Sequence, residues 1–398
     1  MDNGTRGYVQ GLLAARSRAG SGFAPESLHS EDLDPKARPQ TDDVLSRVDK
    51  VLQKMPSEDV PDRDEFERAY KIFMSQAEPA LRKLDKDPTA ALDHGEMLCL
   101  EAVIKVDGTR PTLLVRDDTI DPEHPLAGAW RDTFYSVRDS MRQIAAAVGR
   151  IGPANASASR YFGTGWLVDG QKGLILTNLH VLTGMQMTIP EAMTRTAGGF
   201  RFDKDSVIID FAAEANSLVT KSLPLVEATV PSGIEGSGLL GLDLAVFRIA
   251  DVAGNIQLPQ AIPVSTDLAG PTGQMSSFCL IGFPGRPQET SGTVGGVDWD
   301  WVNGTLFGNR YGVKRIAPGI AHRPLGTVAG DTRRWAFGHD ATTLGGSSGS
   351  PVLAWRDSDF AGFGIHFGGT TIKENLAHAM GQCRDRLVQL GVPVIDPA

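Results

Sequence analysis

The first third of the chain repeats its apolar residues at helical spacing. Three stripes, over residues 44–55, 64–84 and 126–144, place hydrophobic side chains three or four residues apart. Thr41 is a suitable cap for the first helix, and Pro79 should kink the second. These stripes predict amphipathic helices whose apolar faces pack into a core.

Two further segments complete this region. Residues 1–40 are rich in Gly, Ser, Pro and charged side chains and show little periodicity, so we expect a flexible segment. Residues 100–106 and 111–116 are β-rich and flank Asp107-Gly108, a dipeptide that favours a tight turn. They predict a β-hairpin.

From Ala145 onward the pattern changes from helical to β. Short apolar runs alternate with turn residues, which is typical of an all-β domain. The expected strands are Ala146–Ile151, Tyr161–Val168, Leu174–Asn178, Val207–Phe211, Leu244–Ile249, Phe278–Ile281, Trp335–His339, Pro351–Ala354 and Ala361–His366. A final stretch with helical spacing, Lys373 to Leu390, predicts a C-terminal helix.

Length and charge restrict the class of protein. A chain of 398 residues favours two domains over one. The net charge of −9 argues against nucleic acid as a partner, because no excess of Lys and Arg is available to neutralise phosphates. The N-terminus lacks a basic segment followed by an apolar run, and no apolar stretch is long enough to span a membrane. We therefore expect a cytoplasmic protein without a membrane span.

The cysteines do not indicate a disulfide framework. Cys99, Cys279 and Cys383 are few, odd in number and without paired spacing. Such a set fits neither a disulfide scaffold nor a zinc site. We expect three reduced thiols, and we predict no metal and no cofactor.

The stretch from His339 to Leu353 carries the candidate chemistry. It holds Ser348 among small residues, with Gly346 and Gly349 on either side. Glycines allow backbone conformations that aim several N–H groups at one point, as acyl transfer requires for its oxyanion. A serine is a weak nucleophile by itself and needs a base.

Two upstream stretches supply the other parts of a catalytic triad. Leu176-Thr-Asn-Leu-His-Val181 offers His180 as a base, and the strand from Leu244 to Ile249 is preceded by Asp243. The order His, Asp, Ser is the chain order of chymotrypsin-type proteases.

These segments resemble the trypsin-like serine proteases of clan PA in their bacterial form. Gly163-Thr-Gly-Trp-Leu-Val168 and Ile175-Leu-Thr-Asn-Leu-His-Val181 are similar to the "GTGFLV…ILTNxHV" signature of HtrA-like and glutamyl-endopeptidase-like peptidases. Asp243-Leu-Ala-Val246 matches their "DLAV" segment, Gly346-Ser-Ser-Gly-Ser-Pro351 their "GNSGSP", and Gly282-Phe-Pro-Gly285 their "GYPG" loop. Ser347 departs from the family, which has Asn or Asp before the nucleophile. The resemblance covers roughly residues 141–398.

The resemblance implies a mainly β fold with two six-stranded β-barrels and an active site in the cleft between them. It implies that His180 is the base, that Asp243 orients it and that Ser348 is the nucleophile. It also implies that the backbone N–H groups of Gly346 and Ser348 form the oxyanion hole. The expected activity is that of a serine endopeptidase acting on protein or peptide substrates.

The resemblance also indicates a specificity. In glutamyl endopeptidases a threonine or serine and a histidine bind an acidic P1 side chain. Thr343 and the segment Ile365-His-Phe-Gly-Gly369 resemble these elements, so Thr343, His366 and Gly368 are candidate S1 residues. Thr342 stands where trypsin-like specificity requires Asp, which argues against a Lys or Arg preference.

Each residue also has a purely structural interpretation. His180 can be a buried histidine at a strand end, Asp243 a turn residue, Ser348 part of a turn, and His366 and Thr343 packing residues. Three signatures in one order favour the protease. A catalytically silent peptide-binding module and a latent protease that awaits a partner are the alternatives.

A different serine hydrolase also fits part of the loop. Gly345-Gly-Ser-Ser-Gly349 matches the G-x-S-x-G elbow of α/β-hydrolases, with Ser347 as the nucleophile. That fold needs Asp and His on further βα units after the serine, and too little chain remains for them. We reject this alternative.

The sequence thus predicts three parts. They are a flexible segment over 1–40, a helical region with a hairpin over 41–140, and a trypsin-like protease domain over 141–398. The middle part is either packed core or a regulatory module that binds a protein partner.

Overall fold

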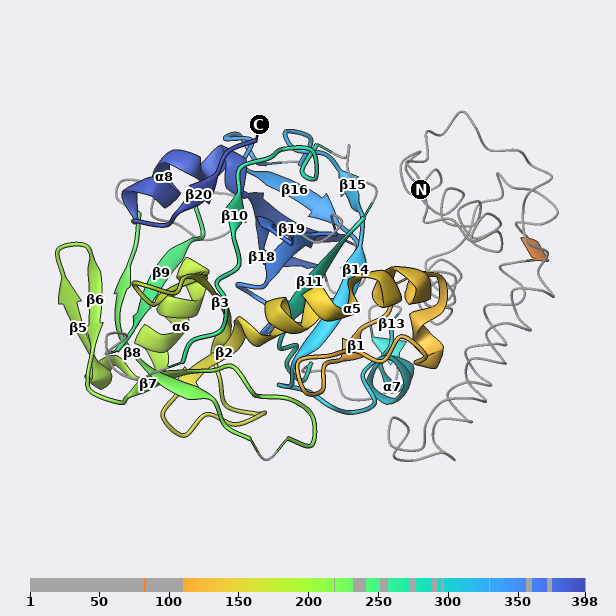
Figure 1. Ribbon diagram of the computed structural model, residues 1–398, viewed down its shortest axis with the longest axis horizontal. Coiled ribbons are helices and arrows are strands. Elements are labelled where there is room, and N and C mark those ends of the chain that lie inside the picture. The colour runs from red at the N-terminus through yellow and green to blue at the C-terminus, as the bar shows by residue number, and fades with distance from the viewer. Residues whose placement is uncertain are drawn as a thin grey trace. The chain divides into compact units, whose positions relative to one another are not determined.

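A computed structural model describes most of the chain beyond residue 110 (Figure 1). The described residues are 82–83, 110–217, 219–231, 241–250, 257–272, 277–287, 293–294, 297–328, 330–355, 360–370 and 374–397. The segment 1–40, the predicted helix over 44–55, nearly all of that over 64–84 and the first arm of the hairpin lie outside them. The mainly β prediction is confirmed by the strands described below.

The chain divides into two compact units. Unit 1 comprises Met1–Leu113, Asp121–Ser136 and Pro287–Arg310, and unit 2 comprises Leu114–Ile120, Val137–Arg286 and Tyr311–Ala398. The described elements of unit 1 are η2 (Pro125–Trp130), β12 (Thr293–Val294), β13 (Val297–Asp298), α7 (Trp299–Trp301) and η4 (Val302–Leu306). Helix α5 (Arg131–Ala146) contributes residues to both units, and with η2 it confirms the helix predicted over 126–144.

The first sheet of unit 2 contains a closed barrel. Its strands are β2 (Val148–Pro153), β3 (Gly163–Asp169), β4 (Leu174–Thr177), β5 (Met193–Thr196), β6 (Gly199–Phe202), β7 (Val207–Asp210), β8 (Ser222–Thr229) and β9 (Ala245–Ile249). The six strands β8, β7, β2, β3, β4 and β9 pair in that order, and β9 pairs again with β8, which closes the ring. Fully buried Leu167, Ile175, Ile209 and Phe247 fill it from four different strands.

The second sheet curls back on itself. Its strands are β1 (Leu113–Leu114), β10 (Val264–Ser265), β11 (Phe278–Gly282), β14 (Arg315–Gly319), β15 (Ala321–Arg323), β16 (Ala336–His339), β17 (Pro351–Ala354), β18 (Gly362–Thr370), β19 (Glu374–Ala379) and β20 (Val394–Ile395). The order β14-β11-β17-β18-β19-β16-β15 begins and ends on strands that only Ile320 separates. Since no pairing between β14 and β15 is found in the described part of the chain, this sheet forms a half-barrel and not a second closed ring, and Phe278, Phe337 and Phe363 pack in its core.

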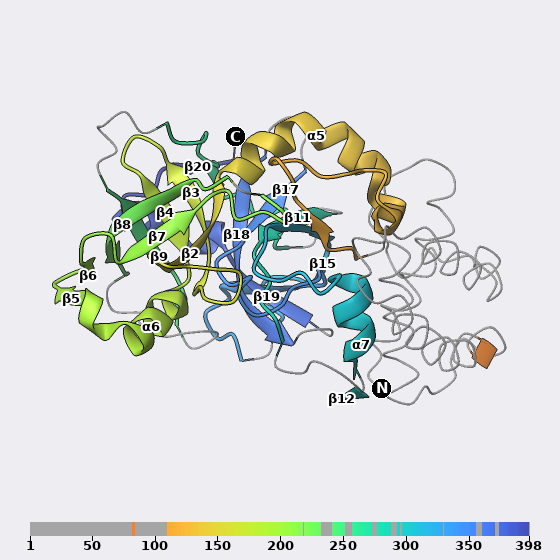
Figure 2. The same cartoon turned by 90° about the horizontal axis from the view of Figure 1, so that it is seen from below.

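Few helices accompany the sheets of unit 2. They are α6 (Leu179–Thr188), η3 (Pro190–Ala192), η5 (Met380–Cys383) and α8 (Arg384–Gln389), and α6 lies beside the strands of the first sheet (Figure 2). None of the helices that the structure describes is both long and apolar enough to cross a membrane.

The predicted helix from Lys373 to Leu390 is wrong in its first half. Glu374–Ala379 forms β19, which pairs with β16 and β18, and only Arg384–Gln389 is α-helical. Alternating Ala377 and Ala379 point into the barrel core. Because alanine is small and a good helix former, it masked the period of two in this segment.

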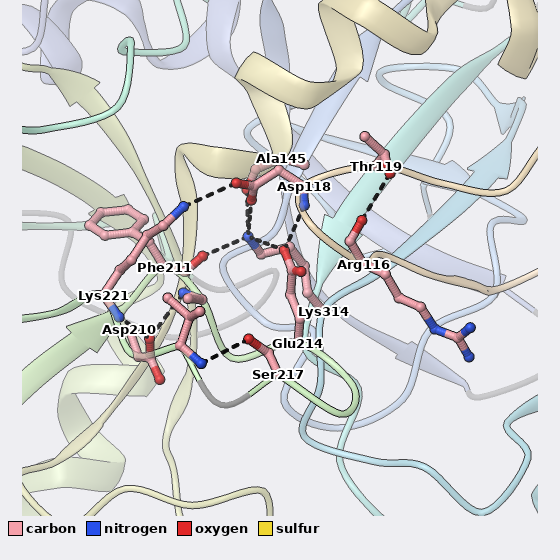
Figure 3. Close-up of polar contacts among 12 residues, drawn as sticks. Arg116, Asp118, Thr119, Ala145, Asp210, Phe211, Glu214, Ser217, Lys221 and Lys314 are labelled. Atoms are coloured by element: carbon pink, nitrogen blue, oxygen red, sulfur yellow. Dashed lines mark hydrogen bonds and ion pairs between the residues drawn. The ribbon is translucent and has the colours of Figure 1, made fainter.

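A buried lysine ties the N-terminal strap of unit 2, Leu114–Ile120, to both sheets. Lys314 lies at the centre of Figure 3, is fully buried and directly precedes β14 of the second sheet. Its ammonium pairs with Asp118 at 3.1 Å and Glu214 at 3.4 Å, and donates to the carbonyls of Ala145 (2.8 Å) and Phe211 (2.7 Å). Burial alone would raise the pKa of Asp118, but Lys314 and Lys221 together outweigh it and the pKa is lowered.

Candidate active site

Strand register brings His180 and Asp243 together. Strands β4 and β9 are antiparallel, with Thr177 opposite Ala245. When this register is continued past the strand ends, Asp243 faces the first residues of α6, where His180 lies. The result is a contact of 2.6 Å between His180 Nδ1 and Asp243 Oδ2, and the backbone N–H of His180 donates to Asp243 Oδ1 at 2.9 Å.

Asp243 is fully buried and its backbone is held on both sides. Asn178 donates its side-chain N–H to the Asp243 carbonyl at 2.8 Å, and the Asp243 N–H donates to His378 Nε2 at 3.2 Å. His378 comes from β19, so the second sheet helps to fix an aspartate of the first. The His180 side chain, by contrast, is 34% exposed and is available to a reactant.

Two turns shape the loop that carries Ser348. The Ser347 N–H donates to the Leu344 carbonyl, and the Ser350 N–H to the Ser347 carbonyl, each at 3.0 Å. Gly346 and Gly349 both have a φ of +90°, a conformation that side chains with a Cβ rarely adopt. Gly345 has no such φ, so the backbone conformation requires glycine at only two of the three glycine positions in this loop.

The Ser348 loop lies next to the start of α6. A Cβ on Gly163 would lie 2.7 Å from Val181 Cγ2 and 3.0 Å from the Ser348 carbonyl oxygen, so both sides pack against this glycine of β3. The structure therefore brings the Ser348 loop to the His180–Asp243 pair. No hydrogen bond joins the described residues Ser348 and His180 in this state, and such bonds often tighten only when substrate binds.

The loop leaves two backbone amides unused. Among the residues that the structure describes, the N–H groups of Gly346 and Ser348 donate to no other group. They lie two residues apart along a tight turn that carries the half-buried Ser348. This arrangement can accept the negative oxygen of a tetrahedral intermediate.

The candidate S1 residues lie on the two segments that flank this loop. Thr343 is buried on the N-terminal side of Ser348 and makes no hydrogen bond to another described residue. His366 is buried on β18, where its carbonyl accepts from Gly349 N–H at 2.9 Å. A Cβ on Gly368 would meet no atom, so space is open beside it. Thr343 and His366 are both described, and no hydrogen bond joins them.

His366 is one of three buried histidines, with His339 on β16 and His378 on β19. His366 Nδ1 lies 3.2 Å from His339 Nε2. Burial, assisted by the nearby His180, lowers the pKa of His366 to about 3, and burial lowers the pKa of His378 to about 4. Burial likewise places the pKa of His339 well below its usual value. All three rings are therefore neutral near pH 7.

Sequence reasoning missed several residues that contact the site. Asn178, His339 and His378 were not assigned a role, although Asn178 and His339 lie in quoted motifs. Thr164 was part of the "GTG" motif but had no assigned contact. His378 carried no local signal, because its partner Asp243 lies on a distant strand. In the described part of the chain, no group of His, Cys, Asp and Glu side chains is arranged to hold a metal ion.

Three comparisons bear on the identity of this arrangement. The family model described as "Trypsin-like peptidase domain" matches residues 163–362. A curated protein, a probable serine protease of Lysobacter enzymogenes, is 42% identical over 385 residues, which is 96% of each chain.

Among solved structures, the inactive form of the Rv3671c protease covers 64% of this chain and 93% of its own, at 15% identity and a TM-score of 0.33. The active form from M. tuberculosis gives 16% identity, 64% and 85% coverage and a TM-score of 0.34. These scores are too low to inform the assignment. The family match and the long curated alignment do inform it: this chain belongs to the trypsin-like peptidases and is a serine protease.

Proposed function

We propose that this protease is an endopeptidase whose triad consists of Ser348, His180 and Asp243. The observation that carries the proposal is the 2.6 Å contact between His180 Nδ1 and the buried carboxylate of Asp243, beside the Ser348 loop. The carboxylate accepts a hydrogen bond from the Nδ1–H, so it selects the tautomer in which Nε2 is free to act as a base.

The proposed reaction follows from these positions. His180 Nε2 takes the proton of the Ser348 hydroxyl while Oγ attacks the peptide carbonyl carbon. The carbonyl oxygen becomes negative and is stabilised by the N–H groups of Gly346 and Ser348. His180 then gives the proton to the leaving amine. In the second half-reaction, His180 takes a proton from water as the water attacks the acyl carbon, and it returns that proton to Ser348 Oγ as the acid product leaves.

Covalent labelling tests this proposal. A fluorophosphonate probe, read by intact mass, is expected to add one mass to the wild-type chain and none to Ser348→Ala or His180→Ala. Labelling of Ser348→Ala contradicts the assignment of the nucleophile, and no labelling of any chain favours the silent binding module.

A latent protease is distinguished by a fourth sample. We propose that residues upstream of the described region regulate the protease through a protein partner. A chain that lacks residues 1–110 keeps Asp118 and its contact with Lys314. If it labels while the full chain does not, the N-terminal region is inhibitory, and equal labelling of both argues against this regulation.

We further propose a preference for an acidic P1 residue, recognised by Thr343 and His366 beside the open space at Gly368. Support comes from the hydroxyl of Thr343, which no other described group occupies, and from His339, which can hold the far side of the His366 ring. Because His366 is neutral in the free protease, a bound carboxylate would raise its pKa and draw a proton to it.

The expected result is a pH-dependent preference for Glu over Gln at P1. Since binding of Glu takes up a proton, the ratio of kcat/KM for Glu to that for Gln should rise as pH falls from about 8 to about 6. The ratio cancels the effect of pH on the triad. Thr343→Val should lower the ratio about tenfold, the cost of one hydrogen bond to a charged group. A panel of peptides in which Leu or Ala at P1 exceeds Glu contradicts the proposal.

A further inference from the structure

Every polar atom of Thr164 is used, and two of them hold the loop that carries Ser348. Thr164 lies on β3 and is fully buried. Its N–H donates to the Ser348 carbonyl at 2.9 Å, and its hydroxyl donates to the Gly346 carbonyl at 2.9 Å. The hydroxyl also accepts the N–H of Phe283 at 3.2 Å, and the Thr164 carbonyl accepts the Thr177 hydroxyl at 2.7 Å.

We propose that Thr164 is the positioning residue of the oxyanion hole. This inference rests on the proposed function, which assigns the hole to the amides of Gly346 and Ser348. Those amides belong to the same two residues whose carbonyls Thr164 holds. With both carbonyls fixed from one rigid strand, the direction of the chain between them is fixed, and so is the direction of the two N–H groups.

The wall behind Gly346 is held in the same way. Tyr161 donates its hydroxyl to the Phe283 carbonyl at 2.8 Å, while the Phe283 N–H is held by Thr164. A Cβ on Gly346 would lie 2.5 Å from Tyr161 Oη and 2.7 Å from the Phe283 carbonyl oxygen. The loop therefore fits closely against a surface that Thr164 and Tyr161 define.

The hydroxyl of Thr164 is the part that a substitution can remove cleanly. Valine has nearly the same shape but no hydroxyl, so Thr164→Val leaves the Gly346 carbonyl and the Phe283 N–H without a partner in the interior. We expect the loop to shift so that these groups find other partners. The Gly346 N–H then no longer points at the developing oxyanion, although substrate contacts elsewhere remain.

The test compares kcat and KM for Thr164→Val and Thr164→Ser on a peptide that the wild type cleaves. Loss of an oxyanion donor costs about 10²–10³-fold, so misdirection by Thr164→Val should lower kcat by about 10-fold to 100-fold. KM should stay within about twofold, because ground-state binding makes little use of this hole. Thr164→Ser restores the hydroxyl and should restore most of kcat.

A peptide aldehyde provides a second measurement. Its adduct with Ser348 carries an oxygen in the hole, so its inhibition constant should rise in Thr164→Val by about the factor lost in kcat/KM. A cleaved peptide product lacks this oxygen, and its affinity should not change. A defect confined to folding would weaken the aldehyde and the product equally.

Thr266→Val is the matched control. Thr266 is a buried threonine of unit 2 whose hydroxyl donates to the Ile395 carbonyl and to the Asp396 carboxylate. Neither partner belongs to the Ser348 loop. It should lose stability but keep kcat.

The inference is overturned if Thr164→Val keeps kcat, if Thr164→Ser is equally impaired, or if Thr266→Val loses kcat to the same extent. Should Thr164→Val unfold in the assay, Thr164→Ala repeats the comparison. A wild type that neither cleaves nor labels refutes the proposed function itself.

Discussion

Replacement of Asp243 by asparagine will lower kcat by roughly 10⁴-fold, with the fold retained. The two carboxylate oxygens of Asp243 each accept an N–H of His180, one from the backbone and one from Nδ1. An asparagine has one acceptor oxygen and one donor group for these two positions. Because the backbone N–H can only donate, the amide NH₂ is expected to turn toward Nδ1.

That orientation reverses the tautomer of His180. With Nδ1 as acceptor, the ring carries its proton on Nε2 and can no longer take one from Ser348. The measurement is steady-state kinetics beside thermal unfolding. Asp210→Asn is the control, since Asp210 is another buried carboxylate of the first sheet that accepts a backbone N–H, from Ala212, but does not contact His180. A value of kcat for Asp243→Asn within about tenfold of wild type would contradict the assigned role.

The parts of the site that the sequence reveals are those with a local signature. The strand ending before His180, the strand starting after Asp243 and the glycine turn around Ser348 each occupy a few consecutive residues. The pairing of β4 with β9 then follows from the fold that these motifs imply. The positions of the candidate triad could therefore be anticipated without coordinates, although their chemical roles remain proposals.

Contacts that support the site were not predictable in the same way. The Thr164 hydroxyl donates to the Gly346 carbonyl, and His378 Nε2 accepts the Asp243 N–H. In each case the two residues lie more than a hundred positions apart in sequence. No period or motif marks such a pair, because the two residues become neighbours only when both sheets have formed. Strand β19, which buries small residues, was not predicted for a related reason: the burial of its alanines depends on the sheet around them.

Lys314 is the strongest example of a contact without a local signal, and it leads to the largest expected change in stability. It lies 196 residues from Asp118 in sequence, yet the two side chains pair in the interior. Lys314→Met will lower the free energy of unfolding by about 3–5 kcal/mol, because it leaves the Glu214 carboxylate without this cation and leaves Asp118 with only the exposed Lys221. Denaturant unfolding of the full chain, followed by tryptophan fluorescence, measures this change.

Lys221→Met tests whether burial is the reason. Lys221 also pairs with Asp118, at 3.2 Å, but its side chain is 53% exposed, whereas that of Lys314 is 0% exposed. Because water and salt screen an exposed pair, its loss should cost at most about 1 kcal/mol. Similar losses for the two variants would contradict the buried-charge argument. A large loss for Lys314→Met alone would mean that the strap Leu114–Ile120 is an integral part of the protease unit, so that its boundary lies before Leu114 and not at residue 141.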